Sequence, residues 1–348
     1  MNTIQIGKKK IGKNQPCFII AEAGVNHNGE LALAKKLVDI AVDAGVDAVK
    51  FQVFKPEGVT TKTANMAEYA EKNIGKEMPQ IDLLKNLALP YKDFKILKDY
   101  CDDRNIIFLA TPHSFDAIDF LEELVPAYKF GSGDITNIPS LQYAARKRKP
   151  ILLGTGMSTL QEVKQAVTAI QSKGNTQIVA LHCTTNYPCQ LNEVNLRAMI
   201  TMQNELTCLM GYSDHTLGLI VPVMAVALGA VVLEKHITID KNLTGPDHKA
   251  SLESHELKQM VAEIRNVEKA MGSSEKKPTD SEKKLMNIVR KSIVASENIK
   301  KGSLIEQEML TFKRPGTGLQ PTDMNKILGK KSKRTIAKDE IFQSDMVE

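Results

Sequence analysis

Short apolar runs rich in Val, Ile and Leu alternate along the first 270 residues with longer segments of helical periodicity. This alternation is typical of a parallel sheet whose strands are joined by crossover helices. We count eight such runs, at residues 17–24, 47–52, 106–112, 127–132, 150–156, 178–185, 209–215 and 230–238. The intervening segments 31–45 and 160–174 each end in Gly, as expected after a helix C-terminus. Eight strand and helix units within ~250 residues predict an α/β fold, the (β/α)8 TIM barrel.

The alternating pattern stops near residue 270, which divides the chain into three parts. We assign residues 1–271 to the barrel. Residues 272–288 are polar and contain Pro278, so we predict a linker there. Residues 289–348 contain short β-type pieces separated by turn signals, which indicates a small second domain. A domain of this size is near the lower limit for independent folding, so we expect it to pack against a neighbour.

Composition excludes several classes of protein. With 42% hydrophobic residues in 348, the chain can bury a large core, and it is not disordered. The net charge is +5, and the whole excess lies in residues 281–348. Five cysteines without CxxC spacing argue against a disulfide framework and a zinc knuckle, and favour the reducing cytoplasm. The longest uncharged run, residues 216–233, is shorter than a membrane helix, and the N-terminus has no apolar leader, so we expect no membrane association.

Polar residues gather at the C-terminal ends of the predicted strands, where a barrel of this type places its active site. They are Glu22, Lys50, Gln52, Thr111, Lys129, Ser132, Thr155, His182, Thr185, His215, Glu234 and His236. Alternation along a strand puts Ser213 and His215 on one face, and does the same for Glu234 and His236. We therefore expect these strand ends to carry the chemistry.

Two histidines are candidate metal ligands. His215 ends the seventh predicted strand and His236 the eighth, so their imidazoles would lie roughly 5 Å apart on adjacent strands. Glu22, on the first strand, neighbours them when the barrel closes. Two imidazoles with carboxylates and no thiolate suit Mn²⁺, or another divalent cation such as Mg²⁺ or Co²⁺, better than a closed zinc site. The alternative is that both histidines are hydrogen-bonded core residues.

Two lysines indicate an anionic substrate. Lys50 and Lys129 point inward from the second and fourth predicted strands, and two buried ammonium groups need an anion. The loops at residues 131–136 and 154–159 offer Gly backbone, hydroxyl groups and a following helix N-terminus, which together favour phosphate or carboxylate. These residues imply a small, phosphorylated, acidic substrate beside a metal.

The sequence resembles the sialic acid synthase family throughout its length. The matching segments are AEAGVNHNG (21–29), VKFQVFK (49–55), ATPHS (110–114), YKFGSGDITN (128–137), GTGMST (154–159), LHCTTNYP (181–188), GYSDHTLG (211–218), LEKHIT (233–238), GPDHKASL (245–252) and KRPGTG (313–318). The resemblance implies a TIM barrel followed by a C-terminal antifreeze-like SAF domain of the β-clip type. It also implies a transferase that condenses phosphoenolpyruvate with an N-acetylated amino sugar to give a nonulosonic acid and phosphate, by C–O cleavage.

The resemblance also assigns residues to roles. It implies that Glu22, Lys50, Lys129, His215 and His236 are catalytic, the two histidines as metal ligands. The implied substrate-binding residues are Gln52, Thr111, Ser132, Asp134, Thr155, Thr185, Tyr187, Ser213, Asp247 and Arg314. It further implies a domain-swapped homodimer in which Arg314 of one chain reaches the sugar N-acetyl group in the barrel of the other. This would explain a second domain that is too small to stand alone.

The segments 49–55 and 245–252 are closer to the legionaminic acid branch than to the N-acetylneuraminic acid branch. We therefore expect 2,4-diacetamido-2,4,6-trideoxymannopyranose as the acceptor and N,N'-diacetyllegionaminic acid as the product, with N-acetylmannosamine as the second choice. Two positions depart from the family pattern. Asp134 stands where many members have Glu, and Thr185 stands where neuraminate synthases carry Asn.

Two other functions are compatible with parts of the pattern. A metal-dependent barrel hydrolase would use the same histidines without phosphoenolpyruvate. Alternatively, the second domain could bind ice or carbohydrate, or nucleic acid through the basic run at residues 330–334. That domain has Phe312 and Phe342 as its only aromatic residues, so stacking on bases is poorly supported and we expect no nucleic acid partner.

Overall fold

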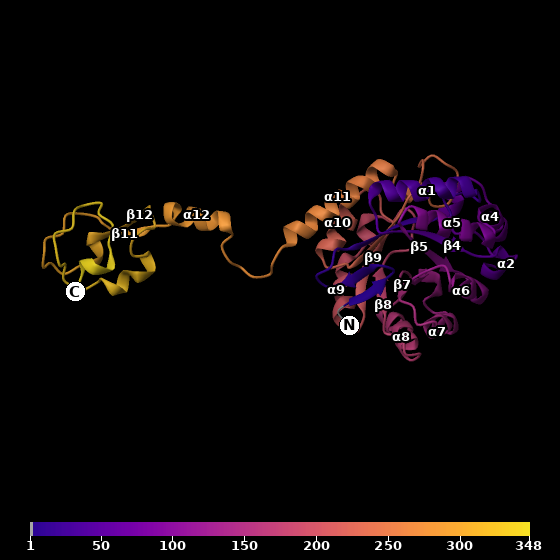
Figure 1. Cartoon of the computed structure of the whole chain (residues 1–348), viewed down its shortest axis with the longest axis horizontal. Helices are drawn as coiled ribbons and strands as arrows, with labels where there is room; N and C mark the ends of the chain where they lie inside the picture. The colour runs from indigo at the N-terminus through magenta and orange to yellow at the C-terminus, as the bar shows by residue number, and fades with distance from the viewer. Residues whose placement is uncertain (1–2) are drawn as a thin grey trace. The chain divides into compact units, whose positions relative to one another are not determined.

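The computed structural model describes residues 3–348. The chain divides into two compact units, the first ending at Gly272 and the second beginning at Ser273 (Figure 1). The first unit holds the alternating strands and helices of the sequence pattern. The second holds the short β-type segments that follow it.

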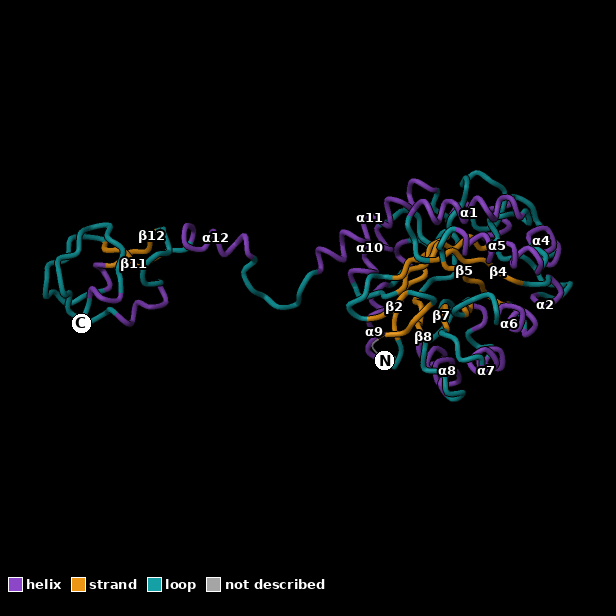
Figure 2. Tube along the Cα trace, in the orientation of Figure 1, coloured by secondary structure: helices purple, strands orange, loops and turns teal. Residues whose placement is uncertain are grey.

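Eight parallel strands close into a barrel in the first unit (Figure 2). They are β3 (Phe18–Gly24), β4 (Ala48–Val53), β5 (Ile107–Pro112), β6 (Tyr128–Phe130), β7 (Ile151–Gly154), β8 (Ile178–His182), β9 (Leu209–Asp214) and β10 (Val232–His236). Their order around the barrel follows the chain, and β10 pairs with β3 to close it, with His236 opposite Glu22. Each strand overlaps one of the eight predicted runs, so the predicted (β/α)8 barrel is confirmed.

The main helices that connect the strands pack against the outside of the barrel and bury the apolar outer face of the strands. They are α1 (Leu31–Ala44), α5 (Tyr91–Asp103), α6 (Phe115–Leu121), α7 (Ile138–Arg146), α8 (Leu160–Gln171), α9 (Leu196–Glu205), α10 (Ile220–Ala227) and α11 (Ser254–Met271). As predicted, α1 ends just before a Gly, and Gly45 has the left-handed φ of 73° that Gly tolerates best. Helix α8 instead ends three residues before Gly174. No helix within residues 3–348 is long and apolar enough to cross a bilayer.

The connection from β4 to α5 is longer than the others and contains three short helices, α2 (Pro56–Val59), α3 (Glu68–Ile74) and α4 (Gln80–Leu87). Helix α3 contacts two loops at the C-terminal end of the barrel. Its Asn73 side-chain amide donates to the carbonyl oxygens of Tyr187 at 3.2 Å and of Pro246 at 2.6 Å. The extra helices therefore help to hold the loops that surround the strand ends.

An N-terminal hairpin of β1 (Thr3–Ile6) and β2 (Lys9–Gly12) closes the opposite end of the barrel. Its buried Ile4, Ile6 and Ile11 belong to the same apolar cluster as the inward side chains at the strand beginnings. The sequence pattern did not predict this hairpin, because strands of four residues are too short to give a clear alternation. The hairpin thus fills the N-terminal end of the barrel with apolar side chains, and the polar strand ends lie at the C-terminal end.

The second unit has its own apolar core, built around Ile293, Ile299, Ile336 and Phe342. Its two strands, β11 (Ser292–Ala295) and β12 (Leu310–Lys313), pair antiparallel. The segment that we predicted as a linker contains helix α12 (Asp280–Val289), which begins with a capping box formed by Thr279 and Glu282. No residue of this helix is buried.

Candidate active site

A cavity of about 170 Å³ lies at the C-terminal ends of the barrel strands. Eleven of the fifteen predicted site residues line it, and they come from seven of the eight strands or the loops that follow them. These residues are Glu22, Lys50, Gln52, Thr111, Lys129, Ser132, Thr185, Tyr187, Ser213, His215 and His236. The structure therefore brings both lysines and both histidines to one place.

Four predicted site residues do not line this cavity. Thr155 is buried behind it and donates its hydroxyl to the Leu181 carbonyl oxygen at 2.9 Å. Asp247 is buried beside His236, with 3.8 Å between Oδ2 and Nδ1. Asp134 is half-buried in the 3₁₀ turn after β6, and Arg314 is an exposed residue of the second unit.

Two buried carboxylates balance the two buried ammonium groups. Lys50 Nζ lies 2.7 Å from Glu22 and 3.7 Å from Glu234, and Lys129 Nζ lies 3.2 Å from Glu234. All four side chains are at most 9% exposed. Glu234 is one of the polar strand-end residues of the sequence pattern, and the family resemblance gives it no role. Its partners, which sequence could not identify, are the two lysines and Ser213, whose hydroxyl donates to it at 3.0 Å.

The two carboxyl groups have different proton affinities. Burial raises the pKa of Glu22, and the opposing attraction of Lys50 does not cancel this effect. Burial also acts to raise the pKa of Glu234, but Lys129 and Lys50 outweigh it and lower that pKa to about 2. Carboxyl groups whose pKa values are pushed apart can take separate roles, one as a proton carrier and one as a fixed anion. Glu22 suits the first role and Glu234 the second.

The two imidazoles lie edge to face, with 5.5 Å between ring centroids and 61° between ring planes. His215 Nδ1 must donate to the Thr184 carbonyl oxygen, 2.6 Å away, because a carbonyl only accepts, so its Nε2 keeps a free lone pair. His236 Nδ1 is buried and has no hydrogen-bond partner. Burial lowers the pKa of His215 to about 4 and that of His236 well below its ordinary value. Both rings are therefore neutral at physiological pH.

Two neutral imidazoles with unused nitrogen atoms are a suitable donor set for a divalent cation. Among residues 3–348, no group of three or more His, Cys, Asp or Glu side chains is arranged to hold a metal. An ion bound by His215 and His236 would thus take its remaining ligands from water or substrate. This is the arrangement of a catalytic site with open positions and differs from that of a structural metal site.

One side of the cavity offers uncharged hydrogen-bonding groups. The Gly156 backbone N–H lies 3.0 Å from Ser132 Oγ and 3.2 Å from Cys183 Sγ. Thr185 Oγ1 is buried and has no hydrogen-bond partner. A Cβ atom on Gly156 would lie 2.3 Å from that oxygen, so any side chain there would displace the Thr185 hydroxyl. Cys183 was not among the predicted site residues, and only the fold shows that it faces the cavity.

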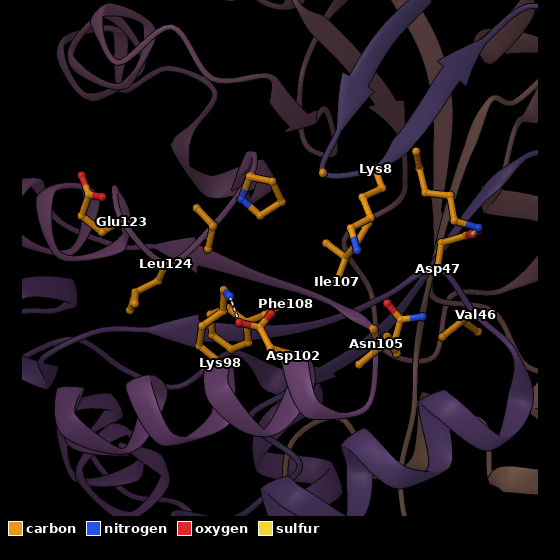
Figure 3. Close-up of a pocket in the computed structure, with 15 residues that line it drawn as sticks. Lys8, Val46, Asp47, Lys98, Asp102, Asn105, Ile107, Phe108, Glu123 and Leu124 are labelled. Carbon is orange, nitrogen blue, oxygen red and sulfur yellow. Dashed lines mark hydrogen bonds and ion pairs between the residues drawn. The ribbon is translucent and has the colours of Figure 1, made fainter.

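A larger cleft of about 700 Å³ lies at the opposite end of the barrel (Figure 3). Its charged side chains are either exposed, as Lys8 and Glu123 are, or ion-paired: Asp47 pairs with Lys9 at 2.8 Å, and Lys98 pairs with Asp102 one helical turn away. These groups do not need a ligand to satisfy them. The smaller cavity is lined by four buried charged side chains and by the imidazoles of His113, His215 and His236, so the capacity for chemistry lies there.

Comparisons with known proteins show the family to which the chain is similar. Residues 37–276 match the model of the NeuB family, and residues 290–348 match that of the SAF domain. The chain is 46% identical over 328 residues to the N,N'-diacetyllegionaminic acid synthase of Legionella pneumophila, covering 93% of this chain and 92% of that protein. It is 45% identical over 329 residues to the protein of the same name from Campylobacter jejuni, with coverage of 94% and 98%. A solved N-acetylneuraminic acid synthetase from Leptospira borgpetersenii superposes with a TM-score of 0.73 at 35% identity, covering 81% of this chain and 94% of that one.

Proposed function

This chain belongs to the NeuB family, and on that premise we propose that it is a nonulosonic acid synthase acting on phosphoenolpyruvate. The acceptor would be 2,4-diacetamido-2,4,6-trideoxymannopyranose. C3 of phosphoenolpyruvate would bond to its aldehyde carbon, one water would add at C2, and the C–O bond to phosphate would break, giving N,N'-diacetyllegionaminic acid and phosphate. The observation that carries the proposal is the convergence of Lys50, Lys129, His215 and His236 on one cavity. The relatives named N,N'-diacetyllegionaminic acid synthase support the choice of acceptor. The solved N-acetylneuraminic acid synthetase makes N-acetylmannosamine the second candidate.

In this proposal the lysines bind the phosphate and carboxylate groups of phosphoenolpyruvate. Before substrate binds, their charges are neutralised by Glu22 and Glu234, which keeps the empty cavity near electrical balance. The incoming anion takes over these ion pairs, while Ser132 and Thr185 offer hydroxyl groups to the phosphate oxygens. The lysines then stabilise the charge that moves onto the departing phosphate.

The histidine side of the cavity would receive the sugar. His215 and His236 would hold Mn²⁺ or another divalent cation, which supplies a Lewis acid for the open-chain aldehyde. Gln52 donates to Glu22 at 3.3 Å, and Asp247 lies beside His236, so both are placed to contact sugar hydroxyl groups. The Tyr187 ring lies 4.1 Å from that of His215 between centroids and limits water access to it. Glu22, whose pKa burial raises, is our candidate to carry the proton between water and the sugar oxygen.

We propose further that the active form is a domain-swapped homodimer in the cytoplasm. Arg314 is exposed, so its guanidinium is available to a partner's substrate. All five cysteines are free thiols, which suits a reducing compartment.

The test is a phosphate-release assay with phosphoenolpyruvate and each candidate sugar, with and without Mn²⁺. We expect release only when both substrates and the cation are present, fastest with the diacetamido sugar. Phosphoenolpyruvate labelled with ¹⁸O in its bridging position should transfer the label to phosphate, because the C–O bond breaks. Release without a sugar would contradict the proposal, and hydrolysis of another phosphate ester would favour a barrel hydrolase.

A further inference from the structure

Lys235 is a buried charge that the proposed chemistry does not use. It lies on β10 between Glu234 and His236, and alternation points it away from the cavity that its two neighbours line. Its side chain is 0% exposed. An ammonium group taken out of water in this way is costly unless partners compensate for it.

The partners of Lys235 flank one of the two cavity histidines. Its Nζ donates to the carboxylate of Asp214 and to the carbonyl oxygen of Thr216, the residues directly before and after His215. Asp214 and Thr216 are both 0% exposed, and Asp214 is also the register partner of Lys235 across β9 and β10. Lys235, which is adjacent to His236, therefore binds both sequence neighbours of His215, one through its side chain and the other through its backbone.

Further hydrogen bonds complete this bracket around His215. The Asp214 carboxylate accepts from the Thr216 backbone N–H at 3.2 Å and from the Thr216 hydroxyl at 3.0 Å. The carbonyl oxygen of His215 accepts from the Cys189 N–H at 2.8 Å. Charge-assisted bonds of this kind, shielded from water, are among the strongest that a protein makes. They leave His215 little freedom to move relative to β10.

We propose that Lys235 is a positioning residue that sets the separation of His215 and His236 for a shared divalent cation. The inference rests on the metal site of the proposed function. With only two imidazoles from the protein, the affinity depends on holding both nitrogen atoms at the right spacing before the ion arrives. A bracket in the barrel wall provides that spacing without occupying the cavity.

The test variant is Lys235→Met/Asp214→Asn. Met has a similar length to Lys, and Asn keeps an acceptor for Thr216, so the contacts of Lys235 are lost without leaving an unpaired buried charge. The matched control is Arg265→Met/Asp47→Asn, which removes an ion pair with 3.4 Å between the charged groups. Neither control residue lines the cavity. A milder variant, Thr216→Val, removes only the hydroxyl that binds Asp214.

Mn²⁺ is titrated into the full-length, metal-free protein without substrate, and free ion is followed by electron paramagnetic resonance. We expect one site per chain in the wild type, an unchanged affinity in the control, and at least tenfold weaker binding in Lys235→Met/Asp214→Asn. Thr216→Val should fall between the two, which keeps the inference testable if the double variant does not fold. Wild-type Mn²⁺ affinity in either bracket variant, or an equal loss of affinity in the control, would overturn the role of Lys235 and leave the metal assignment intact. A wild type that binds no Mn²⁺ would overturn the metal assignment together with it.

Discussion

Replacing Lys50 by Met should destabilise the barrel in a way that depends on pH. Lys50 is 1% exposed and holds together one side of the cavity. Its Nζ lies 2.7 Å from Glu22 and 3.7 Å from Glu234, and 3.2 Å from the Thr111 hydroxyl. Met fills much of the same volume but provides no charge, so Glu22 is left as a buried carboxylate without its closest counter-ion.

The size of the effect follows from these distances. At an effective dielectric constant of ~20, the attraction between Lys50 and Glu22 is worth about 6 kcal/mol. Part of this lost attraction is offset, because the variant no longer has to bury an ammonium group. Breaking a buried pair by removing one partner typically costs about 3–5 kcal/mol in the free energy of unfolding, which is what we expect near pH 7.

The destabilisation caused by Lys50→Met should be smaller at acid pH. Burial already raises the pKa of Glu22 above its ordinary value of 4.5, and loss of Lys50 removes the attraction that opposes this shift. A carboxyl group whose pKa is raised on folding stabilises the protein below its unfolded pKa, and this stability is lost as the pH rises through the folded pKa. The difference between wild type and variant should therefore be small near pH 4.5 and grow toward neutrality.

Urea unfolding followed by circular dichroism at several pH values measures this difference. The control is Lys85→Met, which breaks an exposed pair, 3.2 Å apart and 52% exposed on both sides. It should cost less than about 1 kcal/mol at every pH. A Lys50→Met cost as small as that of the control, or one that does not change with pH, would refute the assignment of Lys50 as the counter-ion of Glu22.

Three further outcomes test the site. His236→Ala should abolish cation-dependent phosphate release while the circular dichroism spectrum stays native, and normal turnover would contradict the metal assignment. Arg314→Ala should raise the KM for the sugar at least tenfold and the KM for phosphoenolpyruvate by less than twofold, as measured by steady-state kinetics with each substrate varied. An equal rise in both KM values would count against a contact between Arg314 and the sugar. Gly156→Ala should weaken phosphoenolpyruvate binding by at least tenfold, because the new Cβ would lie 2.3 Å from Thr185 Oγ1 and 2.9 Å from Ser132 Oγ. Isothermal titration calorimetry measures this affinity, and an unchanged value would show that this pocket does not receive the phosphate.

The barrel and the location of its cavity followed from local pattern. Strand alternation and parallel topology are short-range regularities, and together they bring the ends of all eight strands to one rim. This is why Lys50 and His236, which are far apart in the chain, could be predicted to lie in one cavity. The N-terminal hairpin escaped prediction because its strands are too short to show periodicity.

The pairing of charges could not be predicted in the same way. The sequence shows that Glu234, Lys235 and His236 lie together in a strand that is otherwise apolar, and it requires that they be compensated. It does not show which residues compensate these charges, because ion pairs depend on the register between strands and on distances across the barrel.

The sequence by itself determined the class of fold, the end of the barrel that carries chemistry and the residue types available there. Only the tertiary structure decided that the partner of Glu234 is Lys129 and that the partner of Lys235 is Asp214. The physical reason is that local patterns need only neighbouring residues, whereas charge compensation needs distances of a few ångströms between separate strands, and these exist only after the barrel has closed.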